Sequence, residues 1–77
     1  MQDEIANVMV HVNESMDEFT LNALEDAMRG DRGVVSVGHN PEHPHLLLVA
    51  YDSAVARSST FMHQFHDRGM HAQLVGL

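Results

Sequence analysis

The order in which apolar periodicity changes along the chain constrains its fold more than any other feature. Residues 5–12 alternate between apolar and polar positions, as in a strand with one buried face. Residues 16–29 repeat apolar positions every three or four residues, which is typical of a helix. The same patterns predict further strands over 34–39, 45–52 and 70–75 and a second helix over 58–69. The predicted order is therefore β-α-β-β-α-β.

This order predicts an α+β, ferredoxin-like sandwich, with residues 1–77 forming a single domain. Right-handed crossovers then give a four-stranded antiparallel sheet of order 4-1-3-2 with both helices on one face. Residues 40–44 form the turn between the two middle strands, because two prolines in five residues interrupt a ladder. An open α+β fragment of three elements is the alternative, and it would leave Phe61 and Phe65 with nothing to cover.

The apolar positions on these predicted faces define an expected core. It consists of Val8, Val10, Val12, Leu24, Ala27, Met28, Val35, Val37, Leu47, Val49, Tyr51, Phe61, Phe65, Ala72 and Leu74. Phe19 or Thr20 is expected to join this face in the first helix, whereas Glu25 and Asp26 are expected to face water.

Charge and composition exclude several classes of function. Eleven acidic residues against four arginines and no lysine give a net charge of −7, which argues against nucleic-acid binding and against an anionic membrane surface. The lack of cysteine excludes disulfides, thiolate metal sites, iron–sulfur clusters and cysteine nucleophiles. No apolar stretch approaches the length of a membrane span, and we expect a cytoplasmic location.

Motifs for catalysis are also missing from the sequence. It has no nucleophile motif and no phosphate-binding loop, and the glycines at 30 and 33 end a helix. We therefore expect no enzymatic activity and no required cofactor.

The chain resembles the heavy-metal-associated domain family, the small copper-chaperone-like modules, over residues 5–75. The matching positions are Leu24, Ala27, Gly33, Val34, Tyr51, Asp52, Ser58, Phe61, Phe65, Gly69, Ala72 and Leu74. The resemblance implies a ferredoxin-like fold and a site in the loop after the first strand, where the family carries Met-x-Cys-x-x-Cys. Those cysteines correspond to about Asp17 and Thr20, which with Met16 are a poor donor set for a soft ion such as Cu(I). The resemblance thus implies a divergent member without the thiolate site.

Seven histidines are the second conspicuous feature, and protonating all of them would bring the formal charge from −7 to 0. His39, His43 and His45 surround the predicted turn and are candidate ligands for Zn²⁺, Ni²⁺ or Cu²⁺. The alternative is that they are polar turn residues. His11 and His71 are weaker candidates, expected to be neighbours on adjacent strands, where a structural cross-strand pair is the alternative. His63 and His66 share a helix face, for which a structural role is expected.

Topology predicts where the histidines gather. The loop after the first strand, the turn between the middle strands and the turn into the last strand lie at one end of this fold. We expect six histidines there, namely 11, 39, 43, 45, 66 and 71. We therefore predict that this end of the domain is a pH-responsive or weakly metal-binding surface. The alternative is that turns are simply enriched in polar residues by chance.

The sheet face away from the helices is expected to carry Met9, Leu46 and Leu48. Clustered exposed apolar residues favour a protein partner or a homodimer, with simple shielding by neighbours as the alternative. The leading functional hypothesis is a non-enzymatic module that works through protein contacts. The second is histidine-based binding or sensing of a borderline divalent metal.

Overall fold

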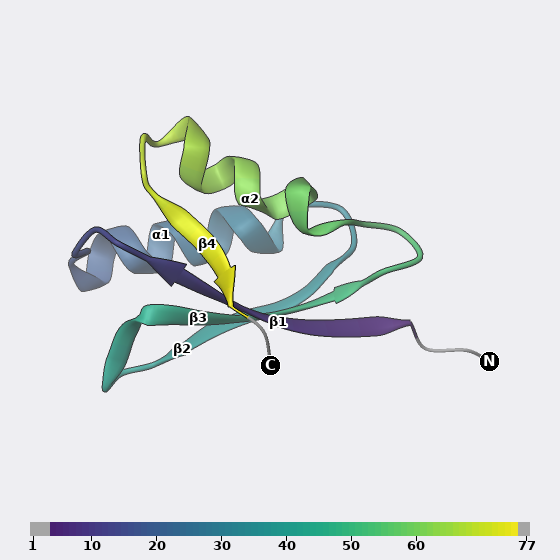
Figure 1. Ribbon diagram of the computed structural model, residues 1–77, viewed down its shortest axis with the longest axis horizontal. Helices are drawn as coiled ribbons and strands as arrows, with labels where there is room; N and C mark the ends of the chain where they lie inside the picture. The colour runs from purple at the N-terminus through teal and green to yellow at the C-terminus, as the bar shows by residue number, and fades with distance from the viewer. Residues whose placement is uncertain (1–3, 76–77) are drawn as a thin grey trace.

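A computed structural model describes residues 4–75 of the protein and has the predicted order of elements (Figure 1). They are β1 (Ile5–Val12), α1 (Glu18–Arg29), β2 (Val34–Asn40), β3 (His43–Asp52), α2 (Ser58–Asp67) and β4 (Ala72–Val75). Within the described residues, neither helix has the length and apolar character needed to cross a membrane.

The four strands form one sheet of order β2-β3-β1-β4, and every neighbouring pair is antiparallel. This is the predicted order read from the other edge, and Figure 1 shows α1 and α2 on the same side of the sheet. β1 pairs with β3 from Ile5↔Asp52 to His11↔Leu46, whereas the short β4 pairs only with Met9–Val12. The ferredoxin-like fold is confirmed.

The core lies between the sheet and the two helices. Its buried members are Val10, Val12, Leu21, Leu24, Met28, Val37, Leu47, Val49, Phe61, Met62 and Phe65. All of these except Leu21 and Met62 were predicted from the sequence. Val8, Tyr51 and Ala72 were also predicted and pack against this cluster half-buried, and Ala27 is half-buried on α1.

Two residues predicted to lie in the core are exposed, Val35 at 59% and Leu74 at 46%. In β2 the register shifts by one residue, since Val34 pairs with Tyr51 and Ser36 with Ala50. The extra residue takes Val35 out of alternation, and Val34 packs against the core in its place. Leu74 lies opposite Val10 on β4, an edge strand, and so has a neighbouring strand on one side only.

The inward face of α1 also differs from the expected one. Leu21, Leu24, Glu25 and Met28 are buried, at positions i, i+3, i+4 and i+7 of one helical stripe. Phe19 is 83% exposed, and Glu25 is only 3% exposed. The expectations that Phe19 faces the core and that Glu25 faces water are therefore wrong.

The turn between β2 and β3 is tighter than predicted. Asn40 pairs with His43 and His39 pairs with Leu47, so residues 44–46 have no counterpart on β2. Pro44, which has no N–H to give to a ladder, lies in this irregular stretch. Regular strand alternation relative to β2 therefore does not fix the direction of His45.

Three chain connections meet at one end of the sheet, at the left of Figure 1: β1 to α1, β2 to β3, and α2 to β4. The Asn13 N–H donates to the His71 carbonyl oxygen at 2.9 Å, which ties two of these connections together. We name the six histidines of this region the histidine end: His11, His39, His43, His45, His66 and His71. By the bounds of the strands and helices, each of the six lies in one of these connections or within three residues of it.

Candidate functional site

His45 is held by the backbone of β1. Its Nδ1 lies 2.8 Å from the Val12 carbonyl oxygen. Because a carbonyl oxygen can only accept, Nδ1 carries the hydrogen and donates it. In the neutral ring the lone pair is therefore on Nε2.

His39 is held by a buried carboxylate. Its Nδ1–H donates to Glu25 Oε2 at 2.6 Å, and the Glu25 side chain is almost fully buried under α1. Arg29 lies 3.8 Å from the second carboxylate oxygen and also donates to the Val37 carbonyl oxygen at 2.6 Å. The hydrogen bond from His39 and the guanidinium of Arg29 stabilise the buried carboxylate, and the network links α1 to β2.

His71 is held by Glu14 from the connection between β1 and α1. The His71 backbone N–H donates to Glu14 Oε1 at 2.8 Å, and its Nδ1–H donates to Oε2 at 2.7 Å. These hydrogen bonds, first from the ring and then from the backbone, hold the pKa of the Glu14 carboxyl below its ordinary value. Both carboxylate oxygens therefore orient one histidine.

His39, His45 and His71 thus share one arrangement. Each Nδ1–H is donated to a protein oxygen, and within residues 4–75 no hydrogen bond involves any of the three Nε2 atoms. Metal-ligating histidines show the same pattern, in which one ring N–H is bonded to a carboxylate or carbonyl and the other nitrogen binds the ion.

His11 lies beside His45. The two rings stack with centroids 6.2 Å apart and planes at 25°. His11 Nδ1 is buried and has no hydrogen-bond partner among the described residues. On the β4 side, His11 is paired with Gln73, and His71 faces Asn13 instead. His71 lies before the first residue of β4, so it is not the residue directly opposite His11, and the expected pairing of the two rings stays a prediction.

The three predicted ligands of the hairpin point in different directions. His39 contacts Glu25, His45 contacts β1, and His43 is exposed at the tip. Across residues 4–75, no three His, Asp or Glu side chains are arranged to hold a metal ion. Metal binding by His39, His43 and His45, or by His11 and His71, stays a prediction.

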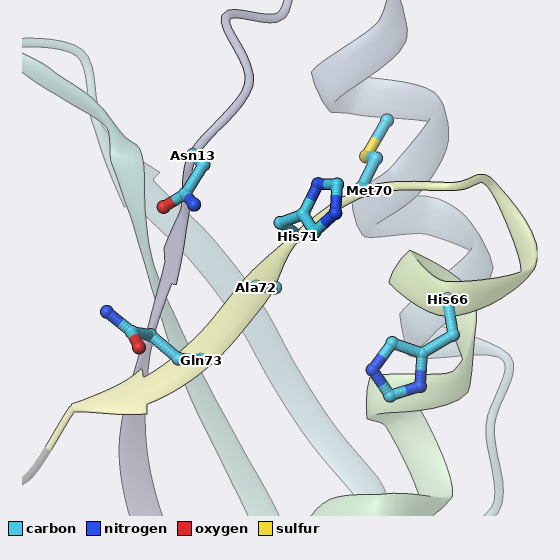
Figure 2. A pocket seen from close by; sticks show the side chains of 6 residues that line it. All are labelled: Asn13, His66, Met70, His71, Ala72 and Gln73. Atoms are coloured by element: carbon cyan, nitrogen blue, oxygen red, sulfur yellow. The ribbon is translucent and has the colours of Figure 1, made fainter.

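A hollow of about 190 Å³ lies between α2 and β4 (Figure 2). Its walls are Asn13, His66, Met70, His71, Ala72 and Gln73. Figure 2 shows the His66 ring projecting from α2 on the side of β4, and His71 at the start of that strand. Sequence reasoning did not include His66 among the ligand candidates. The sequence feature that could have drawn attention to His66 is its position five residues before His71, across a turn from helix to strand.

The segment that corresponds to the Met-x-Cys-x-x-Cys loop of heavy-metal-associated domains forms the N-terminal cap of α1. Asp17 is the N-cap of α1, and its Oδ1 accepts the Thr20 N–H at 2.7 Å. This hydrogen bond lowers the pKa of the Asp17 carboxyl. Asp17 and Thr20 therefore do not fit a thiolate-bound Cu(I) ion, since they offer hard oxygens and one is already bonded to the backbone.

His63 differs from these histidines because both of its ring nitrogens have hydrogen-bond partners. On α2 its Nδ1 lies 3.1 Å from Asp67 Oδ2, and its Nε2 lies 3.1 Å from Asp31 Oδ1. Both nitrogens face carboxylates, so the doubly protonated ring fits best and has no lone pair for a metal. Asp67 and then Asp31 raise the pKa of His63 above its ordinary value of 6.5.

This raised pKa predicts how the link between α2 and the end of α1 depends on pH. The contribution of His63 to stability is complete below about pH 6.5 and is lost as pH rises through the higher folded-state pKa. In an NMR titration, we expect the His63 midpoint to lie above 6.5 and to fall after Asp31→Asn or Asp67→Asn. A midpoint at or below 6.5 in the intact protein contradicts the two-carboxylate contact.

The face of the sheet away from the helices carries apolar side chains. Met9 lies opposite Leu48 on one side and Val75 on the other. Leu48 is 53% exposed, whereas its neighbours Leu47 and Val49 are buried toward the helices. Met9, Leu46 and Leu48 form what we name the open sheet face.

No family model matches the chain, and no curated protein matches its sequence. Solved structures do match. Oxidized MerP from Ralstonia metallidurans CH34 has a TM-score of 0.78 at 17% identity, over 91% of this chain and 96% of that one. A copper binding domain from HMA7, a P-type ATPase, gives 0.78 at 17% over 91% and 93%. The CsoZ metallochaperone gives 0.73 at 18% over 92% and 97%.

At these identities the likeness concerns the fold. It extends over almost the whole of each chain, as the resemblance from the sequence implied for residues 5–75. The chain therefore has the ferredoxin-like fold of these solved structures, and its sequence has no cysteine.

Proposed function

We propose that the protein is a non-enzymatic binding module that takes a borderline divalent cation, Zn²⁺, Ni²⁺ or Cu²⁺, through imidazole nitrogens at the histidine end. The observation that carries this proposal is the shared state of His39, His45 and His71, whose Nδ1–H groups are donated to protein oxygens at 2.6–2.8 Å. This leaves their Nε2 lone pairs as ligands of the type that these ions prefer. The likeness in fold to a copper binding domain and to a metallochaperone supports it.

The choice of cation follows from the donor atoms. Cu(I) sites in proteins are typically built on thiolate sulfur, and the chain has no cysteine to supply it. Ca²⁺ and Mg²⁺ prefer several carboxylate or carbonyl oxygens. Of the acids near the three rings, Glu14 and Glu25 already accept hydrogen bonds from histidine. Imidazole nitrogen is the donor that remains.

A titration followed through the imidazole resonances tests this function. With low micromolar Zn²⁺ near neutral pH, we expect the ring signals of the histidine end to shift and those of His63 to stay in place, because both His63 nitrogens face carboxylates. Cu(I) is expected to leave the spectrum unchanged. Flat spectra with Zn²⁺, Ni²⁺ and Cu²⁺ contradict metal binding.

A second candidate function is binding of a protein partner, or of a second copy of the chain, through the open sheet face. The exposure of Leu48 beside Met9 favours it, because exposed apolar side chains that cluster on a sheet are typical of a surface that contacts another protein. Concentration-dependent tumbling that Leu48→Ser abolishes supports a homodimer. Tumbling of a monomer at all concentrations, with equal behaviour of Leu48→Ser, contradicts self-association.

A further inference from the structure

We propose that the side of the sheet away from the helices docks against a second copy of the chain, with each Leu48 seated in the hollow over Gly38 of the other copy. This inference rests on the second candidate function, binding through the open sheet face, and it names the occupant and the contact. It does not depend on metal binding at the histidine end.

An exposed side chain and a hollow lie next to each other on this side of the sheet. Leu48 of β3 is 53% exposed, and Gly38 of β2 lies directly opposite it in the ladder. A hollow of about 580 Å³ lies at this position, and Ser36, Gly38, Asn40 and Leu48 are among the residues that line it. A β-carbon built on Gly38 would meet no atom within 4 Å. The space beside Leu48 is therefore open to an apolar side chain from another molecule.

The positions of Leu48 and Gly38 allow a symmetric contact. Because the two residues are paired on neighbouring strands, a two-fold axis that runs between β2 and β3 places each Leu48 over the Gly38 of the other copy. Sheets that pack face to face lie about 10 Å apart, and their side chains interdigitate. The two leucines then lie side by side, and each fills the hollow of the other copy. A partner of different sequence would need its own apolar side chain and its own hollow at matching positions.

The distribution of charge also favours a second copy. The chain has a net charge of −7, so two copies repel each other where their acidic surfaces meet. Among the described strand positions that point away from the helices, Asp52 at the end of β3 is the one acidic residue, and there is no arginine. Two copies can therefore meet around Leu48 without bringing like charges together. A basic partner would find no acidic side chain there to pair with.

The size and charge of the contact predict how the dimer behaves in solution. A contact limited to β2 and β3 of each copy is small compared with the about 800 Å² per partner of a standard interface, so we expect a weak dimer at high micromolar concentration. Added salt is expected to strengthen it, because salt screens the repulsion between two chains of charge −7. A dimer that salt weakens contradicts this account and favours a contact between opposite charges.

Sedimentation equilibrium of the full chain tests the contact from both of its sides. Leu48→Ser removes the inserted side chain and Gly38→Val fills the hollow, and we expect each to weaken dimerisation at least about tenfold. Gly38→Val is expected to keep the fold, because valine favours strands and the backbone at Gly38 is not left-handed. Phe19→Ala is the matched control, since it removes an 83% exposed ring from α1, and is expected to leave the dimer unchanged.

A sample that mixes isotope-labelled and unlabelled copies shows the contact directly. We expect nuclear Overhauser effects between copies that join the Leu48 methyl groups to the Gly38 α-protons. If these are absent and Leu48→Ser weakens the dimer but Gly38→Val does not, the contact with the hollow is overturned and binding through the open sheet face stands. If the chain is a monomer up to millimolar concentration, both this inference and self-association are overturned.

Discussion

Phe65→Ala is expected to lower the free energy of unfolding by about 3–5 kcal/mol. The ring is fully buried beside Phe61 and Met62 from the same helix, and its carbonyl oxygen closes the turn into β4. A domain of this size has a small margin of stability, so the variant is expected to be largely unfolded at 37 °C. Urea denaturation followed by circular dichroism measures the change.

Phe19→Ala is the matched control for this prediction. It removes the same ring from α1, where Phe19 is 83% exposed, and is expected to change the stability by less than about 0.5 kcal/mol. Equal losses for the two variants contradict the position of α2 on the sheet.

Glu25→Ala is expected to destabilise the protein by about 3 kcal/mol, although α1 favours alanine as a helix former. The substitution removes the buried carboxylate that accepts from His39 at 2.6 Å and lies 3.8 Å from Arg29. Both partners are then left beside an apolar cavity under α1. Thermal and urea unfolding measure the loss.

Asp26→Ala provides the comparison at the next position. Asp26 also pairs with Arg29, at 2.6 Å, but its side chain is 74% exposed. Exposed pairs contribute about 0–1 kcal/mol, so this variant is expected to remain close to the parent protein. If Glu25→Ala is as mild as Asp26→Ala, then the buried network does not contribute to holding α1 on β2.

The topology could be predicted from the sequence because it depends on periodicity and on the handedness of connections. Alternation over 5–12 and helical spacing over 58–69 set the order of elements, and the order leaves one compact arrangement. The meeting of three chain connections at one end followed from that arrangement, without any knowledge of side-chain contacts.

Which side chains of an element face the core could not be predicted where the sequence fits two alternatives. Val34, Val35 and Val37 satisfy either phase of a strand, and the bulge that exposes Val35 is set by pairing with β3. Glu25 looks like a solvent-facing residue because its compensating partner, His39, is fourteen positions away. Such a burial becomes visible only when α1 is packed on the sheet.

The candidate site shows the same limit. Histidine positions could be read from the sequence, but their partners could not, because Glu14 and His71 are 57 residues apart in the chain. The predicted hairpin set of His39, His43 and His45 assumed regular pairing around the turn. The irregular stretch at Pro44 instead sends His45 to the backbone of β1.

Calorimetric titration with Zn²⁺ at about pH 7 and again at about pH 5 tests the central claim most directly. Imidazole must be neutral to bind a metal, so protons compete with the cation below the ordinary histidine pKa. The account predicts saturable binding near neutral pH that is lost at the acidic pH, in a protein that stays folded at both. Absence of binding at pH 7, or an affinity equal at the two pH values, contradicts a histidine-based metal site.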